Sequence, residues 1–91
     1  MAIKQITKAP TRKTARALLA FNTRVLRAER DITKEELANL AGIDRGYIGQ
    51  IEAETRAVSV NIIDRLANAL DVPIARLFAE QVSTLRKDNV T

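Results

Sequence analysis

The sequence predicts an all-α domain of five helices. Its 91 residues are enough for one domain. Hydrophobic residues make up 46% of the chain and aromatic residues only 3%, so the core must consist of Leu, Ile, Val and Ala. This composition favours packed helices over a β-sandwich, which uses more β-branched and aromatic residues. Three glycines and two prolines are also too few for the many tight turns of an all-β fold.

The first two helices are expected over about residues 14–30 and from residue 33 to the region of Gly42. Thr14 is a suitable N-cap for the first helix. Its apolar residues have the i, i+3, i+4 spacing of a buried stripe: Leu18, Phe21, Val25 and Leu26. Thr33 and Glu36 have the spacing of a capping box. The second helix has an apolar face of Leu37, Ala38, Leu40 and Ala41, and Gly42 is free to adopt the positive φ that ends it.

The third and fourth helices follow after short connections. Asp44 is a suitable N-cap for the third helix, on which Ile48 and Ile51 point to the core. Residues 54–56 form the next loop, and Ser59 caps the fourth helix. The buried stripe of the fourth helix has five members: Ile62, Ile63, Leu66, Ala67 and Leu70.

The fifth helix is expected to begin at Pro73, because proline suits the first helical position. Its inward-facing residues are Ile74, Leu77 and Phe78, and the same spacing continues through Val82 and Leu85 to about Arg86. These elements divide the chain into three parts: a flexible basic arm over residues 1–13, a domain over residues 14–80, and a partly helical C-terminal tail over residues 81–91.

Charge is distributed unevenly along the chain. Residues 1–30 contain eight basic side chains and one acidic one, a balance of +7, whereas residues 31–91 contain seven basic and ten acidic ones, a balance of −3. A basic N-terminal segment suggests a polyanionic partner. On composition alone, a merely solvated charged surface explains the same residues equally well.

Histidine and cysteine are both absent, which excludes disulfides, zinc sites with these ligands, thiol nucleophiles and His-based acid–base catalysis. Glu35 and Glu36 are adjacent and diverge on a helix, so they form no carboxylate pair. We therefore expect no enzyme, no metal, no cofactor and no small-molecule ligand. No apolar run approaches the ~18–20 residues that span a bilayer, and the N-terminus lacks a secretory signal, so we expect a cytoplasmic protein.

Residues 33–52 have the pattern of two short helices joined by a tight turn. Ala38 is small where the helices would cross closely, and Gly42 permits the reversal. Three isoleucines hold the second helix on the rest of the bundle: Ile43, Ile48 and Ile51. Such a unit presents its second helix at a steep angle to the first, and that helix fits the major groove of B-DNA.

This segment, TKEELANLAGIDRGYIGQIE, resembles the helix-turn-helix of the Xre, Cro and phage-repressor family. The resemblance continues through Ser59, residues 66–72 and residues 77–78, and covers about residues 18–79. Residues 44–52 look most like the small controller proteins of restriction–modification systems. The resemblance implies a five-helix, phage-repressor-like domain and a transcriptional regulator that binds a palindromic double-stranded DNA operator as a homodimer.

The resemblance also implies roles for individual residues. Five of them would read bases: Asp44, Arg45, Gly46, Tyr47 and Gln50. Arg45 is the best candidate for guanine and Gln50 for adenine, while Asp44 is better explained as an N-cap. Four residues would bind phosphate: Thr33, Lys34, Arg56 and Asn61. Arg27 and Glu52 occupy the positions of a structural, buried ion pair.

One such domain makes few base contacts, so specific binding requires two copies on half-sites about one helical turn apart. The resemblance places the dimer interface after the fourth helix, with Leu77, Val82 and Leu85 as candidates. Without a second domain for an effector, regulation would depend on protein concentration, which suits an autoregulatory repressor or controller. RNA polymerase would be a further partner of an activator. The alternative is an antitoxin or adaptor whose main partner is a protein.

Overall fold

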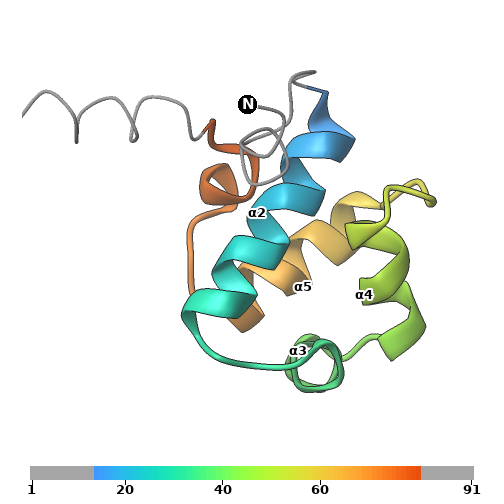
Figure 1. Cartoon of the computed structure of the whole chain (residues 1–91), viewed down its shortest axis with the longest axis vertical. Coiled ribbons are helices and arrows are strands. Elements are labelled where there is room, and N and C mark those ends of the chain that lie inside the picture. The colour runs from blue at the N-terminus through green and yellow to red at the C-terminus, as the bar shows by residue number, and fades with distance from the viewer. Residues whose placement is uncertain (1–13, 81–91) are drawn as a thin grey trace, which may run out of the picture.

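The computed structural model describes residues 14–80 of the chain. These residues form four α-helices and one 3₁₀-helix, and they contain no strand. The elements are α2 (Ala15–Glu29), α3 (Lys34–Ala41), α4 (Arg45–Glu52), α5 (Val60–Leu70) and the 3₁₀-helix η1 (Ile74–Phe78) (Figure 1). The all-α class is confirmed for this part of the chain.

The prediction of a fifth α-helix is wrong over the described residues. Pro73 is the extended N-cap of η1 instead of its first helical residue, and Ala79 returns to an extended backbone after five helical residues. A segment this short forms too few backbone bonds to offset the cost of nucleating an α-helix, and the tighter 3₁₀ turn is the usual outcome. The expected continuation through Val82 and Leu85 lies outside the described residues.

The N-terminal caps of all four α-helices are confirmed. The hydroxyls of Thr14, Thr33 and Ser59 each accept a bond from the backbone N–H three residues later, at 3.0–3.2 Å. The Asp44 carboxylate accepts from the N–H of Gly46 at 3.1 Å. The capping box is complete, because the backbone N–H of Thr33 donates to Glu36 Oε1 at 2.8 Å. Each cap satisfies a donor that would otherwise have no partner in the helix.

The C-terminal ends of the four α-helices also share one backbone conformation. Within two residues of each helix end, one residue has left-handed backbone geometry: Asp31, Gly42, Glu54 and Asp71, with φ of 53°, 71°, 61° and 56°. The N–H of the following residue then donates to the carbonyl five positions earlier, the pattern of a Schellman motif. Only Gly42 is a residue that adopts this geometry without strain, and it is the only one of the four that the sequence predicts.

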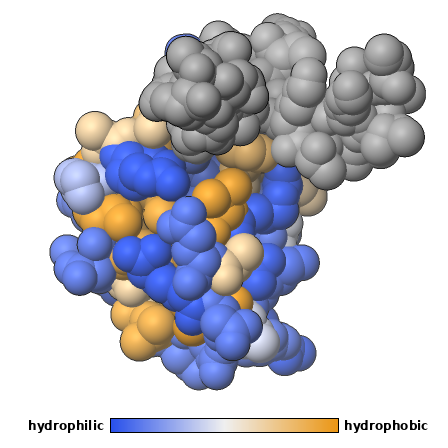
Figure 2. Space-filling model, turned by 60° about the vertical axis from the view of Figure 1, so that its left-hand side comes forward, coloured by the Kyte–Doolittle hydropathy of each residue, from blue (hydrophilic) through white to orange (hydrophobic). Residues whose placement is uncertain are grey.

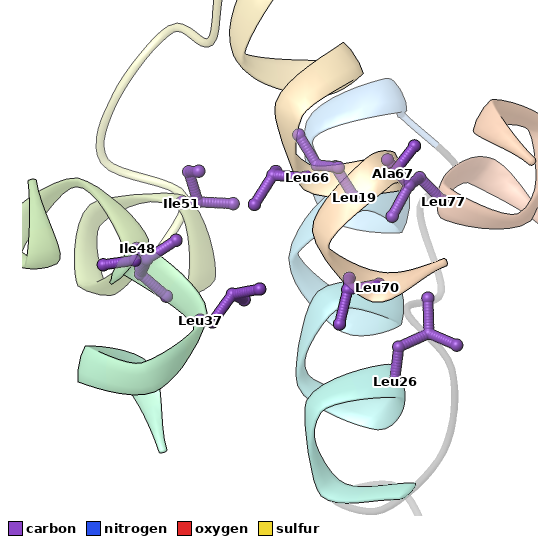
Figure 3. Close-up of a cluster of buried hydrophobic side chains, with 10 residues drawn as sticks. Leu19, Leu26, Leu37, Ile48, Ile51, Leu66, Ala67, Leu70 and Leu77 are labelled. Carbon is purple, nitrogen blue, oxygen red and sulfur yellow. The ribbon is translucent and has the colours of Figure 1, made fainter. Parts of the chain in front are cut away.

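The core is a single aliphatic cluster to which all five elements contribute (Figure 3). Its members are Leu19, Leu26, Leu37, Ala38, Ile48, Ile51, Leu66, Ala67, Leu70 and Leu77. In Figure 3, Leu37, Ile48 and Ile51 of α3 and α4 face the side chains of α2 and α5. Hydrophobic residues at the surface lie in separate patches among hydrophilic ones on the face drawn in Figure 2.

Two residues expected to face the core are exposed. Leu40 is 61% exposed, because Leu37, Ala38 and Ala41 already fill the buried arc of α3 and Leu40 falls outside it. Ile74 is 48% exposed at the start of η1. No helix within residues 14–80 has the length and apolar character needed to cross a membrane.

The assignment of Leu77 to a dimer interface is wrong. Its side chain has no exposed surface and packs in the core, where η1 contacts α2 and α5. A side chain so placed contributes to the stability of the domain and cannot contact a second copy. The other two candidates, Val82 and Leu85, lie outside the described residues.

Asn22 is a fully buried polar residue that ties η1 to α2. Its Nδ2 lies within hydrogen-bond distance of three carbonyl oxygens, those of Leu18, Leu77 and Ala79, at 2.9–3.0 Å. Its Oδ1 accepts a bond from Arg76 Nη1 at 3.0 Å. These four contacts of the Asn22 side chain, which we call the Asn22 network, fix the position of η1 on α2.

Candidate nucleic-acid interface

The helices α3 and α4 form the predicted helix-turn-helix. Residues 42–44 join them, and α3 is seen almost end-on in Figure 1 while α4 runs along the edge of the molecule. The two axes therefore cross steeply. Because α3 packs on α4 and α5, and α4 also packs on α2, one side of α4 is fixed to the domain and the opposite side is left open.

The fixed side of α4 ends in an ion pair between Glu52 and Arg27 of α2. Arg27 Nε lies 2.9 Å from Glu52 Oε2, and Nη2 donates to Oε1 at 3.1 Å, so the contact is bidentate. The Glu52 side chain is only 6% exposed and that of Arg27 20%. The bonds to the Glu52 carboxylate raise the pKa of Arg27 above its ordinary value, although burial acts to lower it. The expected ion pair is thus present.

Arg24 makes a further connection between α2 and α4 that the sequence does not predict. Its Nη1 donates to the backbone carbonyl of Glu52 at 2.8 Å, at the C-terminal end of α4. A carbonyl at this end lacks a partner within the helix, and the positive guanidinium also suits the negative end of the helix dipole. Arg24 and Arg27 lie three apart on α2, and this spacing on one helix face is the signal that could have identified Arg24.

Arg45, at the start of α4, is a highly accessible member of the predicted base readers. Its side chain is 73% exposed, and Nη1 lies 3.5 Å from Glu35 Oε2 of α3. An exposed pair of this kind contributes only about 0–1 kcal/mol, so it offers little resistance when another ligand approaches Arg45. Asp44 caps α4 through the N–H of Gly46, which is the role that the sequence favours for it.

Tyr47, Gln50 and Arg56 lie together, although the sequence assigns them to different kinds of contact. Arg56 Nη1 donates to Gln50 Oε1 at 2.8 Å. The Arg56 guanidinium carbon also lies 4.1 Å from the centroid of the Tyr47 ring. Gln50 and Arg56 are exposed and Tyr47 is half-buried, so this group forms part of the outer surface of α4.

The remaining predicted phosphate contacts are exposed near helix N-termini. Thr33 and Lys34 stand at the beginning of α3, with the Thr33 hydroxyl occupied by the capping box. Asn61 is exposed in the first turn of α5, after the loop that carries Arg56. Gly46 is exposed on α4, and a side chain added at Gly49 would meet open space.

Comparison with known proteins agrees with this geometry. The family model described as Helix-turn-helix matches residues 24–77, more than half of the chain and all of α3, α4 and α5. The chain belongs to the helix-turn-helix family. Its described residues thus include both the two-helix unit of the family and the helices that support it.

This helix-turn-helix chain has named relatives of two kinds. A hypothetical transcription factor from Neisseria meningitidis serogroup B is 34% identical over 68 residues, which is 75% of this chain and 64% of that protein. The control protein C.SmaI from Serratia marcescens is 34% identical over 64 residues, 70% of this chain and 76% of that protein. The structure of the restriction–modification controller protein C.AhdI from Aeromonas hydrophila superposes with a TM-score of 0.65, at 39% identity, over 67% of this chain and 92% of that one.

Proposed function

We propose that this helix-turn-helix chain regulates transcription by placing α4 in the major groove of double-stranded DNA. The observation that carries the proposal is the division of α4 into two faces. Ile48, Ile51 and Glu52 are buried against the domain, while Arg45 and Gln50 are exposed and carry groups that bond base edges. A rigidly held helix with such an outer face is the usual reader of B-DNA.

The relatives indicate the kind of regulator. C.SmaI is named as a control protein and C.AhdI as a restriction–modification controller protein. The relative from Neisseria meningitidis is named as a hypothetical transcription factor. We propose an autoregulatory protein of the cytoplasm that acts as a homodimer on a palindromic operator. Val82 and Leu85 remain our candidates for the dimer contact. Two-fold symmetry would place the second α4 in the next major groove on the same side of the duplex.

The charges of the helix-turn-helix unit suggest how DNA is attracted. Residues 33–56 contain three basic and five acidic side chains, a balance of −2. Four of the acidic groups have partners within the domain: Glu52 with Arg27, Glu35 with Arg45, and Asp44 and Glu36 in helix caps. Because Arg27 is itself paired with Glu52, residues 1–30 keep seven basic side chains against one acidic one, a balance of +6, and we infer that the attractive field comes largely from them.

The proposal is tested by selecting from a pool of random-sequence duplex DNA with the purified protein and sequencing the bound fraction. We expect an inverted repeat whose half-sites lie about one helical turn apart. Arg30→Ala is the control for the substitutions that follow, since Arg30 is an exposed arginine at the end of α2 whose ion pair within residues 14–80 is a distant one, with Glu29 Oε1 at 3.9 Å. Enrichment that does not exceed salt-sensitive background would contradict the proposal and favour a protein partner.

Arg45→Ala is expected to weaken binding to the selected site by about 1–3 kcal/mol per half-site and to relax the preference at one base pair. The reason is that the exposed guanidinium would be lost from the outer face of α4 without any change in its buried face. Competition binding with the selected and the scrambled duplex measures the effect. An equal loss on both duplexes would instead assign Arg45 to phosphate.

Lys34→Ala is expected to weaken binding to all duplexes alike. Each lysine that neutralises a phosphate releases counterions, so its loss should lower the slope of log K against log[salt] by about one unit per half-site. Titrations at four or five salt concentrations measure this slope. Arg30→Ala removes one charge of the basic segment 1–30 and measures how much of the change a general loss of positive charge produces. An unchanged slope would rule out a phosphate contact at Lys34.

A further inference from the structure

The loop after α4 returns Arg56 to the outer face of that helix. The Schellman motif at Glu54 brings the N–H of Thr55 to the carbonyl of Gln50 at 3.0 Å, and the Thr55 hydroxyl lies 3.4 Å from the same oxygen. Arg56 follows directly, so its guanidinium is placed beside the side chain of Gln50. The bonds from Thr55 to the Gln50 carbonyl therefore determine where Arg56 lies.

Two contacts then hold the guanidinium. It donates to Gln50 Oε1 at 2.8 Å and stacks over the Tyr47 ring at 4.1 Å. Tyr47 and Gln50 are three residues apart, so they stand on the same side of α4 and one guanidinium reaches both. We call these three side chains the Arg56 cluster.

The hydrogen bond fixes the orientation of the Gln50 amide. A guanidinium has donors and no acceptor, so the amide atom that faces it must be the oxygen. The Nε2 group, with its two N–H donors, is thereby directed away from Arg56. A glutamine without such a partner presents its oxygen and its nitrogen equally.

This orientation changes which base Gln50 can read. A glutamine recognises adenine by accepting from N6 and donating to N7, which requires both amide atoms. In the Arg56 cluster the oxygen already accepts one bond from Arg56, and the adjoining positive charge disfavours a second donor such as adenine N6 at its remaining lone pair. Guanine presents two acceptors in the major groove, O6 and N7, and it suits the N–H groups of Gln50 and Arg56.

We propose that Arg56 sets the base preference of Gln50, so that the two residues together read guanine where an unpartnered Gln50 would read adenine. Arg56 acts as a specificity-determining residue and not as an isolated phosphate contact. The inference rests on the proposed binding of DNA by α4, and it concerns one base pair within each half-site.

The test repeats the selection from random duplex DNA with the wild-type protein and with Gln50→Ala, Arg56→Ala and the control Arg30→Ala. The base pair at which Gln50→Ala loses its preference is the one that Gln50 reads. There we expect the wild-type protein and Arg30→Ala to prefer guanine over adenine by roughly tenfold, the range of a good bidentate contact. Arg56→Ala should shift that same position toward adenine and leave the rest of the motif unchanged.

The outcomes separate the inference from the function on which it rests. An inverted repeat with adenine at the Gln50 position in the wild-type protein, or a guanine preference that persists in Arg56→Ala, overturns the inference alone. The absence of any selected motif overturns the proposed function and the inference with it. Without DNA, the side-chain amide resonances of Gln50 should shift in Arg56→Ala and stay in place in Arg30→Ala, and unchanged resonances in both variants would contradict the hydrogen bond.

Discussion

Arg27→Met is expected to lower the free energy of unfolding by about 3–5 kcal/mol, because it leaves the Glu52 carboxylate buried without its partner. The Glu52 side chain is 6% exposed and receives two bonds from Arg27. Arg27 also donates to the carbonyl of Ile32 at 3.1 Å, so the substitution loses a third bond. Since small domains are stable by only about 5–15 kcal/mol, urea denaturation should show a large decrease in the midpoint.

Two controls distinguish the buried pair from a general effect of removing an arginine. Arg30→Met removes an exposed arginine whose contact with Glu29 spans 3.9 Å, and it should change stability by no more than about 0.5 kcal/mol. The double variant Arg27→Met, Glu52→Leu should recover much of the loss, since it removes both charges. A loss in Arg27→Met that merely equals that of Arg30→Met would show that the ion pair does not stabilise the domain.

Asn22→Ala is expected to lower the free energy of unfolding by about 2–4 kcal/mol, because it leaves buried carbonyl groups without donors. The affected oxygens are those of Leu77 and Ala79, and Arg76 also loses the acceptor Asn22 Oδ1. Both thermal and urea denaturation should report the loss. Hydrogen exchange should additionally show that the amides of η1 open more readily than those of α3, since Asn22 connects η1 to α2.

Asn68→Ala is the matched control for this substitution. Asn68 is an exposed asparagine on α5, and its replacement by alanine should change the stability by less than about 0.5 kcal/mol. If Asn22→Ala were as mild as Asn68→Ala, the carbonyl groups near η1 would have to find other donors. The position of η1 would then depend on the packing of Leu77 and not on the Asn22 network.

The helix starts could be predicted from the sequence because their determinants are local. Thr14, Thr33, Asp44 and Ser59 each bond a backbone N–H two or three residues away, so the short pattern around them contains the information. The left-handed residues Asp31, Glu54 and Asp71 could not be predicted in the same way. Each is strained locally, and the packing of the helices on either side determines where the chain must turn.

The partners of buried polar residues are harder to predict from the sequence than helix starts. Asn22 bonds carbonyls 55 and 57 positions later, and no local pattern indicates such partners. A signal was nevertheless present, because Asn22 lies four residues from both Leu18 and Leu26, within the predicted buried stripe. A polar residue in the middle of an apolar stripe needs internal bonds, and this rule would have identified it.

For the candidate nucleic-acid interface, the sequence likewise predicts positions but not the contacts between them. The positions of Arg45, Gln50 and Arg56 relative to the helix-turn-helix follow from the sequence pattern. The bond between Gln50 and Arg56 does not, because it depends on the turn at Glu54 that returns the loop to α4. Sequence therefore predicts which residues stand on the outer surface, and the structure adds which of their atoms remain available.

The two faces of α4 have a consequence for how descendants of this protein diverge. Ile48, Ile51 and Glu52 hold the helix, whereas Arg45 and Gln50 take no part in the core, and a side chain at Gly49 would meet only open space. Substitutions at Arg45, Gly49 and Gln50 therefore leave the stability of the domain almost unaffected. After a gene duplication, two copies can acquire separate target sequences one substitution at a time, and each intermediate protein still folds.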